Sequence, residues 1–514
     1  MLVLSLIWGA TSPEAAAQKV TNTPVPEAVH TQIQRDLNGA DFEGKDGPLQ
    51  RIGGPLVTIY REYQWHQRTK AGRPYEPSIQ LARVKDGAIL IDAIARESGR
   101  ALLADLRQIG LRNGAQEGRV VSGRLPIDRL GELARLPTLR QALPALFMRP
   151  RPTPIGGSDG ELSVGRASDA ASRKVGATTT QGDAVLQAGQ ARSQFDTEGE
   201  DVIIGIISDS YNTSPDASTS AADDVASGDL PGPGNPNGYT TPVNVLEDEP
   251  GESDEGRAMA QIIHDVAPAA ELAFHTGFGS GQAGFAAAIR NLREQAEAGV
   301  IVDDIIFLAE PMFQDGVVAQ AVEEVTADGA VYLSSAGNSG TNGYGDRYDE
   351  IPAVPGRLQP TNARYDFGGG DSLQTVTIPE GGTVQYILQW SDAYASAGGA
   401  GAETDIDFYL TDKEGNEVLA SSTFDNVDSD PVEFIEYTNA DSIDADGDGT
   451  RDVTFQIGIE RFSGPAPEFI RYVNFGVGSI DEYTQDDPNV VGDGPSTVYG
   501  HANTDAAIAV AASA

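Results

Sequence analysis

Residues 203–210 read Ile-Ile-Gly-Ile-Ile-Ser-Asp-Ser, an apolar run that ends in polar side chains. Such a run suits a strand of a parallel sheet, which is buried on both faces. Further apolar runs at 271–275, 304–308 and 330–335 alternate with segments of helical spacing. This alternation predicts right-handed βαβ units, and therefore an α/β fold with a parallel sheet and helices on both faces. Functional side chains of such folds gather where strands end, which makes Asp209 a candidate site residue.

Two later stretches add polar groups at comparable places. Residues 254–260 read Asp-Glu-Gly-Arg-Ala-Met-Ala and open a helix, and residues 333–340 read Leu-Ser-Ser-Ala-Gly-Asn-Ser-Gly and end a strand. Together with 203–210 they resemble, in chain order, the Asp, His and oxyanion-Asn blocks of subtilisin-like serine peptidases. The resemblance implies that Asp209 orients a base and that Asn338 stabilises the oxyanion.

The chain departs from that family in two respects. Glu255 stands where the family has His, and no Gly-Thr-Ser-x-Ala block with a nucleophile occurs. Sedolisins use Glu as the base on the same fold, so the resemblance implies Glu255 as general base, although Met259 stands where their Asp would be. Asp209 then has to be the second acid. Either the chain stops before the nucleophile segment, or it is a pseudoprotease, and both interpretations stay open.

The end of the strand expected at 304–308 is a candidate for substrate recognition. By the same resemblance, Leu308, Ala309 and Glu310 belong to the segment that pairs with the substrate backbone. Recognition would then use main-chain hydrogen bonds, as in β-augmentation. Glu310 is expected to lie near the cleft.

The flanking sequence divides into recognisable segments. An apolar run before an Ala-Ala-Ala site predicts a signal peptide over 1–17 and an extracellular or cell-surface protein. A mobile leader (18–77) precedes an α+β domain (78–150), which looks like a pro-region or is an independent binding module. A linker (151–185) then leads to the first part of the peptidase domain (186–350).

From 360 to 480 the apolar pattern changes to a period of two, which predicts a β-sandwich. Within it, residues 404–412 are similar to pre-peptidase C-terminal domains of secreted proteases. The apolar run 506–512 suits a fully buried parallel strand. The sandwich is therefore expected to be inserted in the peptidase domain, which continues over 490–514.

Composition limits the classes of partner. A net charge of −41 over 514 residues opposes nucleic-acid binding, and no cysteine is present to form a disulfide. No segment after the signal peptide is expected to span a bilayer. Alternating carboxylates around a Gly turn predict a Ca²⁺ loop, with an acidic β-turn as the alternative, at Asp444, Asp446, Asp448 and Asp452.

These observations favour a secreted subtilisin-like serine endopeptidase that hydrolyses polypeptides and lacks its nucleophile-bearing segment in this chain. The alternative is a non-catalytic, calcium-binding surface or adhesion protein built on a protease-fold scaffold. The oligomeric state is not predicted.

Overall fold

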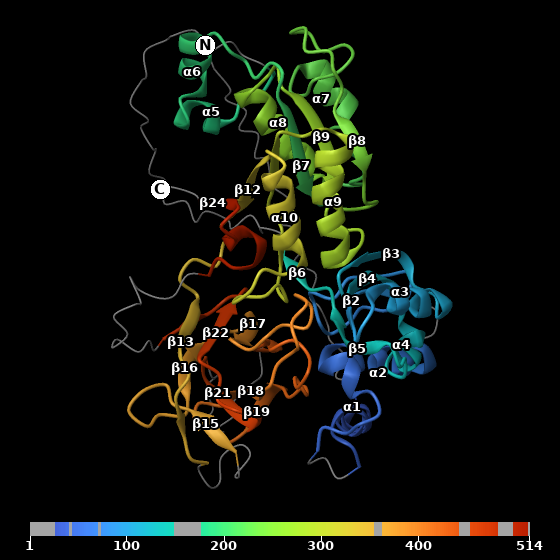
Figure 1. Cartoon of the computed structure of the whole chain (residues 1–514), viewed down its shortest axis with the longest axis vertical. Coiled ribbons are helices and arrows are strands. Elements are labelled where there is room, and N and C mark those ends of the chain that lie inside the picture. The colour runs from blue at the N-terminus through green and yellow to red at the C-terminus, as the bar shows by residue number, and fades with distance from the viewer. Residues whose placement is uncertain are drawn as a thin grey trace, which may run out of the picture.

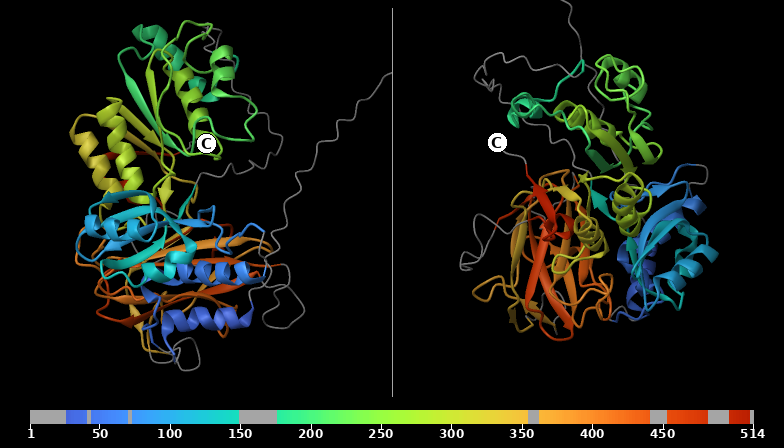
Figure 2. Two further views of the ribbon diagram at one scale, coloured as in Figure 1. Left: turned by 90° about the vertical axis from the view of Figure 1, so that its right-hand side faces the viewer. Right: turned by 45° about the horizontal axis from the view of Figure 1, so that its top comes forward.

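A computed structural model describes residues 26–40, 44–69, 73–148, 176–353, 362–440, 453–481 and 497–511. The described residues form an N-terminal unit (26–148), a parallel-sheet unit (176–335 with 497–511) and an antiparallel unit (343–481) (Figure 1). The N-terminal and antiparallel units lie side by side, and the parallel sheet lies beyond one end of both (Figure 2). Among the described residues no helix combines the length and apolarity needed to cross a bilayer.

The N-terminal unit packs helices on an antiparallel sheet of order β1-β2-β4-β3, in which β5 also pairs with β2. Its elements are α1 (Glu27–Asn38), η1 (Gln50–Ile52), α2 (Gly53–Thr69), β1 (Val84–Lys85), β2 (Ala88–Ala95), α3 (Gly99–Gln108), β3 (Arg112–Glu117), β4 (Val120–Pro126), η2 (Ile127–Arg129), α4 (Leu130–Leu133), β5 (Leu139–Pro144) and β6 (Phe147–Met148).

The expectation of a mobile leader over 18–77 is wrong for the described residues 26–40 and 44–69. Ile33 of α1 and Leu56 of α2 are buried in the same core as Ile91 of β2. Val29, Ile33 and Leu37 of α1 recur every four residues, as apolar residues of an amphipathic helix do. The helical signal was therefore present in the sequence and was not recognised among the polar residues.

The second unit contains a six-stranded sheet of order β24-β12-β10-β7-β9-β8, in which every pair is parallel. Its strands are β7 (Ile203–Ser208), β8 (Asn244–Glu247), β9 (Glu271–Thr276), β10 (Val300–Asp303), β12 (Val331–Ser335) and β24 (Ala507–Val510). Its other elements are α5 (Gln181–Val185), α6 (Ala188–Phe195), α7 (Ala221–Ser227), α8 (Glu255–Val266), α9 (Gly281–Gln295), β11 (Ile306–Phe307), α10 (Val317–Ala327) and η3 (Gly500–Asn503).

Helices cover both faces of this sheet. Ile206 packs with Ala260 of α8, whereas its neighbour Ile207 packs with Ile289 of α9 and Val322 of α10. Since adjacent residues of a strand point to opposite faces, α8 lies on one side of the sheet and α9 with α10 on the other. The expected α/β arrangement is therefore present.

Two sequence expectations about strands need correction. The strand expected over 304–308 is β10, which ends at Asp303, and the following β11 pairs with β6 and not with the parallel sheet. The strand expected to be fully buried, β24, is an exposed edge. Ile508 is 52% exposed and Val510 is 50% exposed.

The antiparallel unit has two sheets around one core. Val376 of β16 and Phe408 of β18 come from one sheet, Tyr386 of β17 and Tyr472 of β22 from the other, and all four are buried together. Its strands are β13 (Gly343–Arg347), β14 (Glu350–Ile351), β15 (Ala363–Tyr365), β16 (Gln374–Thr377), β17 (Thr383–Trp390), β18 (Asp405–Thr411), β19 (Val418–Ser422), β20 (Val432–Thr438), β21 (Thr454–Ser463), β22 (Phe469–Asn474) and β23 (Ser479–Ile480).

Side chains of the N-terminal unit reach into both other units. The Lys45 ammonium donates to Asp405 (2.7 Å), to Asp407 (2.6 Å) and to the Phe424 carbonyl (2.9 Å) of the antiparallel unit. In the parallel-sheet unit, the N-terminus of α9 is capped by side chains of the N-terminal unit.

The residue that precedes α9, Ser280, makes no side-chain cap. Instead, Gln282 N donates to the Asp92 carboxylate at 3.1 Å and Ala283 N donates to the Ser122 hydroxyl at 3.0 Å. These two side chains belong to β2 and β4, so they supply acceptors to N–H groups that a helix leaves unpaired at its start.

Candidate active site

Three adjacent strands end at one edge of the parallel sheet. In the register of β7, β10 and β12, Ile207 pairs with Asp303, and Asp303 pairs with Ser334. The residues that follow these strands therefore leave the sheet at the same level. This places Asp209, Asp304 and Asn338 at a common carboxyl edge, where sites in open α/β sheets form.

Asp209 is fully buried and acts as a cap for α8. Its Oδ1 accepts from Glu255 N at 2.8 Å, and its Oδ2 accepts from Ser253 N at 2.6 Å. The Ser253 hydroxyl and Ser210 N also donate to this carboxylate. Asp254, the residue before the helix, has a left-handed backbone (φ 62°) and makes no cap of its own. Asp209 thus fixes the start of α8, and with it the partly buried Glu255.

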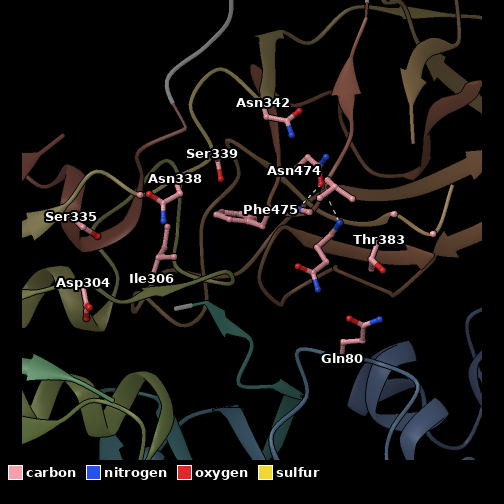
Figure 3. A pocket seen from close by; sticks show the side chains of 16 residues that line it. Gln80, Asp304, Ile306, Ser335, Asn338, Ser339, Asn342, Thr383, Asn474 and Phe475 are labelled. Carbon is pink, nitrogen blue, oxygen red and sulfur yellow. Dashed lines mark hydrogen bonds between the residues drawn. The ribbon is translucent and has the colours of Figure 1, made fainter. Parts of the chain in front are cut away.

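A cavity of about 400 Å³ opens beside this edge. Asp304 and Ser335 line it from the strand ends, and Asn338 lines it from the loop after β12 (Figure 3). Loops of the antiparallel unit close the opposite wall with side chains that include Asn474 and Phe475. The structure therefore joins Asp209 and Glu255 by a hydrogen bond, and it places Asn338 separately, on the cavity wall.

Asp304 is a residue that the sequence analysis missed. Burial, and after it the negative charges of Glu255, Asp303 and Asp209, raise its pKa to about 8, while a hydrogen bond with the Ser208 hydroxyl opposes the shift. Its Oδ1 is buried without a hydrogen-bond partner. A signal was present in the sequence, because two acidic residues follow Val300-Ile301-Val302. The strand was placed four residues too late, so neither Asp was expected at its end.

A second polar cluster lies beneath the edge and is closed to solvent. His501 Nδ1 lies 2.8 Å from Glu310 Oε1, and His501 Nε2 lies 3.2 Å from Asp303 Oδ1 and 3.3 Å from Ser334 Oγ. All four residues are at most 4% exposed. Glu310 therefore does not border the cleft, contrary to the sequence expectation, because its carboxylate binds a buried imidazole.

The order Ser334, His501, Glu310 resembles a nucleophile, base and acid, but its electrostatics do not suit that role. Burial alone lowers the pKa of His501, yet Glu310 and Asp303 outweigh burial and raise it to about 10. At neutral pH both ring nitrogens therefore carry protons, and neither can take one from Ser334. The cluster is a buried ion network.

The segment expected to pair with substrate is paired within the chain. β11 lies antiparallel to β6, with Phe307 opposite Phe147, and Leu308 N donates to Leu146 O at 2.9 Å. The Leu308 carbonyl accepts from the Tyr499 hydroxyl at 3.1 Å. Leu308 is buried and Ala309 is partly buried, so the N-terminal unit occupies this backbone edge.

No group of three or more His, Asp or Glu side chains that could hold a metal ion is found in the part of the chain that the structure describes. The calcium loop expected at Asp444, Asp446, Asp448 and Asp452 lies outside the described residues.

Comparisons with known proteins find similarity of structure only. No protein-family model matches the chain, and no curated protein matches it. Similar solved structures include the CspB protease of Clostridium perfringens, at 11% identity and a TM-score of 0.27, covering 55% of this chain and 64% of that chain. Fervidolysin from Fervidobacterium pennivorans, a keratinolytic enzyme related to subtilisin, has 16% identity and a TM-score of 0.28, covering 69% and 53%.

A third similar structure is that of the prenylagaramide maturation protease PagA, at 14% identity and a TM-score of 0.21, covering 34% of this chain and 57% of that chain. The chain thus spans 64%, 53% and 57% of these three proteases, less than two thirds of each.

Proposed function

We propose that the chain belongs to a secreted serine endopeptidase of the subtilisin/sedolisin type, with Glu255 as general base and Asn338 as oxyanion donor. The observation that carries this proposal is the register of β7, β10 and β12. It sets Asp209, Asp304 and Asn338 at one strand edge, while the Asp209 carboxylate holds the start of the helix that carries Glu255.

In this proposal the roles follow from position. Glu255 takes the proton of the nucleophile's hydroxyl, because it is the first residue of α8 and stands beside the edge. The Asn338 side-chain amide, on the cavity wall, donates to the oxygen that becomes negative during attack on a peptide carbonyl. Asp209 acts through Glu255, as the residue that fixes its helix.

We propose that the nucleophile is a serine on a further segment that packs against the open face of β12 and β24. Val331, Ile508 and Val510 are 45%, 52% and 50% exposed on this face. Neighbouring exposed apolar side chains of this size are typical of a surface that another segment covers. The face ends at the same edge as Asn338, because β24 runs parallel to β12.

The pairing of β6 with β11 supports a pro-region role for the N-terminal unit and a substrate role for this edge. A substrate backbone would add to β11 as β6 does here, through main-chain hydrogen bonds. The antiparallel unit would be an insert, because the chain returns from it to pair β24 with β12.

We also propose, from sequence spacing alone, that Asp444, Asp446, Asp448 and Asp452 bind Ca²⁺ and that the protein acts outside the cell or at its surface. Titration calorimetry with Ca²⁺ tests the first point. Binding should be lost when Asp446 and Asp448 are both changed to Asn, and unchanged binding in that double variant would refute the loop.

The function is tested by labelling the protein expressed from its natural reading frame with a serine-directed phosphonate at acid and neutral pH. Labelling should persist at acid pH, where a histidine base would already be protonated, because the ordinary pKa of Glu is about two units below that of His. Glu255→Gln should abolish it, whereas Glu294→Gln, at an exposed position on α9, should not. Absence of labelling at every pH would favour the non-catalytic surface protein.

A further inference from the structure

We propose that the antiparallel unit forms one wall of the substrate cleft, and that Phe475 on this wall selects peptides with an apolar side chain next to Asn338. This inference rests on the proposed function, because it names the substrate class of the proposed active site. It gives the antiparallel unit a role in substrate recognition.

The antiparallel unit contributes as much to the cavity beside Asn338 as the rest of the chain does. Half of the described residues that line this cavity belong to the antiparallel unit, in the segments 381–385 and 474–477. Figure 3 shows the Phe475 ring directed from this unit toward Asn338 and Ile306. A peptide whose carbonyl group approaches the Asn338 amide would therefore place a neighbouring side chain against the Phe475 ring.

Phe475 is held in place by contacts outside the cavity. Its backbone N donates to Gln385 O at 2.9 Å. Its ring meets the ring of the buried Tyr499 edge to face, with the centroids 6.1 Å apart. Phe475 is nevertheless partly exposed. An aromatic side chain that is fixed by its neighbours and still accessible suits contact with a ligand, because little conformational freedom is lost on binding.

The same wall is tied to the loop that carries Asn338. Asn474 N donates to Asn342 O at 2.9 Å, and the Asn342 side-chain amide donates to Gly478 O at 3.2 Å. These hydrogen bonds join the loop after β12 to the segment that follows β22. They fix the position of Phe475 relative to the proposed oxyanion donor, which a residue that selects substrates requires.

The chemical character of the cavity favours an uncharged, apolar side chain. Ile306 and Val477 add apolar surface to that of Phe475. Among the described residues that line the cavity, Asp304 alone is ionisable, so an acidic side chain would find no cation there. A basic side chain would find its partner on the wall opposite Phe475. Burial of a charge without a partner is costly, whereas burial of apolar surface is favourable.

The test measures the binding of N-acetyl-Ala-Ala-Xaa amides to this chain by titration calorimetry, with Phe, Leu, Ala, Glu or Lys as the last residue. The Phe and Leu peptides should bind about tenfold more tightly than the Glu and Lys peptides. Phe475→Ala should reduce the preference for the Phe peptide over the Ala peptide by about fivefold to tenfold, because an aromatic contact is lost. Phe195→Ala, at a position of α6 that is 69% exposed, should leave every affinity unchanged.

Equal weakening of all five peptides in Phe475→Ala would mean that the ring has a structural role, and it would overturn the assignment. Val477→Lys gives a result even if Phe475→Ala fails to fold, because Val477 is 51% exposed. This variant adds a cation at the cavity and should raise the affinity for the Glu peptide relative to the Phe peptide by about threefold. An unchanged ratio would also overturn the assignment.

These measurements need no nucleophile, so their failure is distinguishable from failure of the peptidase proposal. Selective binding without phosphonate labelling would support the wall and refute the peptidase. Labelling together with unselective binding would support the peptidase and refute the wall.

Discussion

Replacement of His501 by Gln gives the most direct check on the electrostatics beneath the site. The imidazolium lies between Glu310 and Asp303, at 2.8 Å and 3.2 Å, and all three side chains are at most 1% exposed. Gln can donate to one of these carboxylates but carries no charge. The variant therefore leaves two buried carboxylates uncompensated at the junction of β10 and η3.

Two routes to the magnitude agree. Removing one partner of a buried ion pair costs about 3–5 kcal/mol. Independently, a rise in the His501 pKa from 6.5 to about 10 corresponds to about 5 kcal/mol at most. A raised histidine pKa gives stability that is complete below pH 6.5 and is lost as the pH rises through about 10. The difference in stability between the wild type and His501→Gln should therefore shrink as the pH rises across that interval.

Hydrogen exchange with mass spectrometry measures this effect locally, in peptides that cover β10, β11 and η3. Comparing both proteins at each pH removes the intrinsic exchange rate from the difference in opening free energy. His30→Gln, at an exposed position of α1, serves as the control. A difference below about 1 kcal/mol at pH 7, or one that does not shrink toward pH 10, would refute the charged network.

Three further changes test other contacts. Asp209→Ala removes the cap of α8 and should destabilise the start of this helix by about 1–3 kcal/mol. Amide hydrogen exchange in the first turn of α8 should become faster. Unchanged protection there would show that the helix does not need this cap. Lys45→Met leaves two buried carboxylates without their cation, which should cost about 3–5 kcal/mol of stability. The urea midpoint of unfolding, followed by Trp390 fluorescence in the antiparallel unit, should therefore fall. An unchanged midpoint would mean that the ammonium contributes nothing to the stability of this unit. Gly256→Ala puts a Cβ 2.2 Å from an aromatic ring carbon and should lower the melting temperature, while Gly299→Ala, where no atom lies within 4 Å, should not; equal effects would contradict the steric argument.

The parallel sheet could be predicted because its strands carry uninterrupted apolar runs and its helices keep regular spacing. The register of β10 could not, since this strand ends in an acidic residue that is buried. Asp303 is tolerated there because His501, about two hundred positions later, supplies the opposing charge. A pairing over that separation leaves no local signal, so the sequence pattern placed the strand too late and hid Asp304 with it.

The candidate site shows the same division between local and distant information. Asp209 was chosen from its place after an apolar strand, and both Asp209 and Glu255 were chosen because their segments resemble blocks of subtilisin-like peptidases. The structure joins the two residues by the hydrogen bond from Glu255 N. Glu310 was placed at the cleft by analogy with a strand edge, but its surroundings depend on the distant residue His501. Likewise, β24 was expected to be buried from its composition alone, although its exposure depends on which segment covers its face.

The first turn of α9 is finished by Asp92 and Ser122, side chains from a unit more than 150 positions earlier in the chain. A polypeptide that began after residue 148 would contain every apolar contact between α9 and its own sheet, yet it would present bare amide groups at the helix start. The N–H groups in the first turn of α9 are therefore fully hydrogen-bonded only when both units are present. We expect a break in the chain between the two units to destabilise the parallel-sheet unit far less after the units have assembled than before.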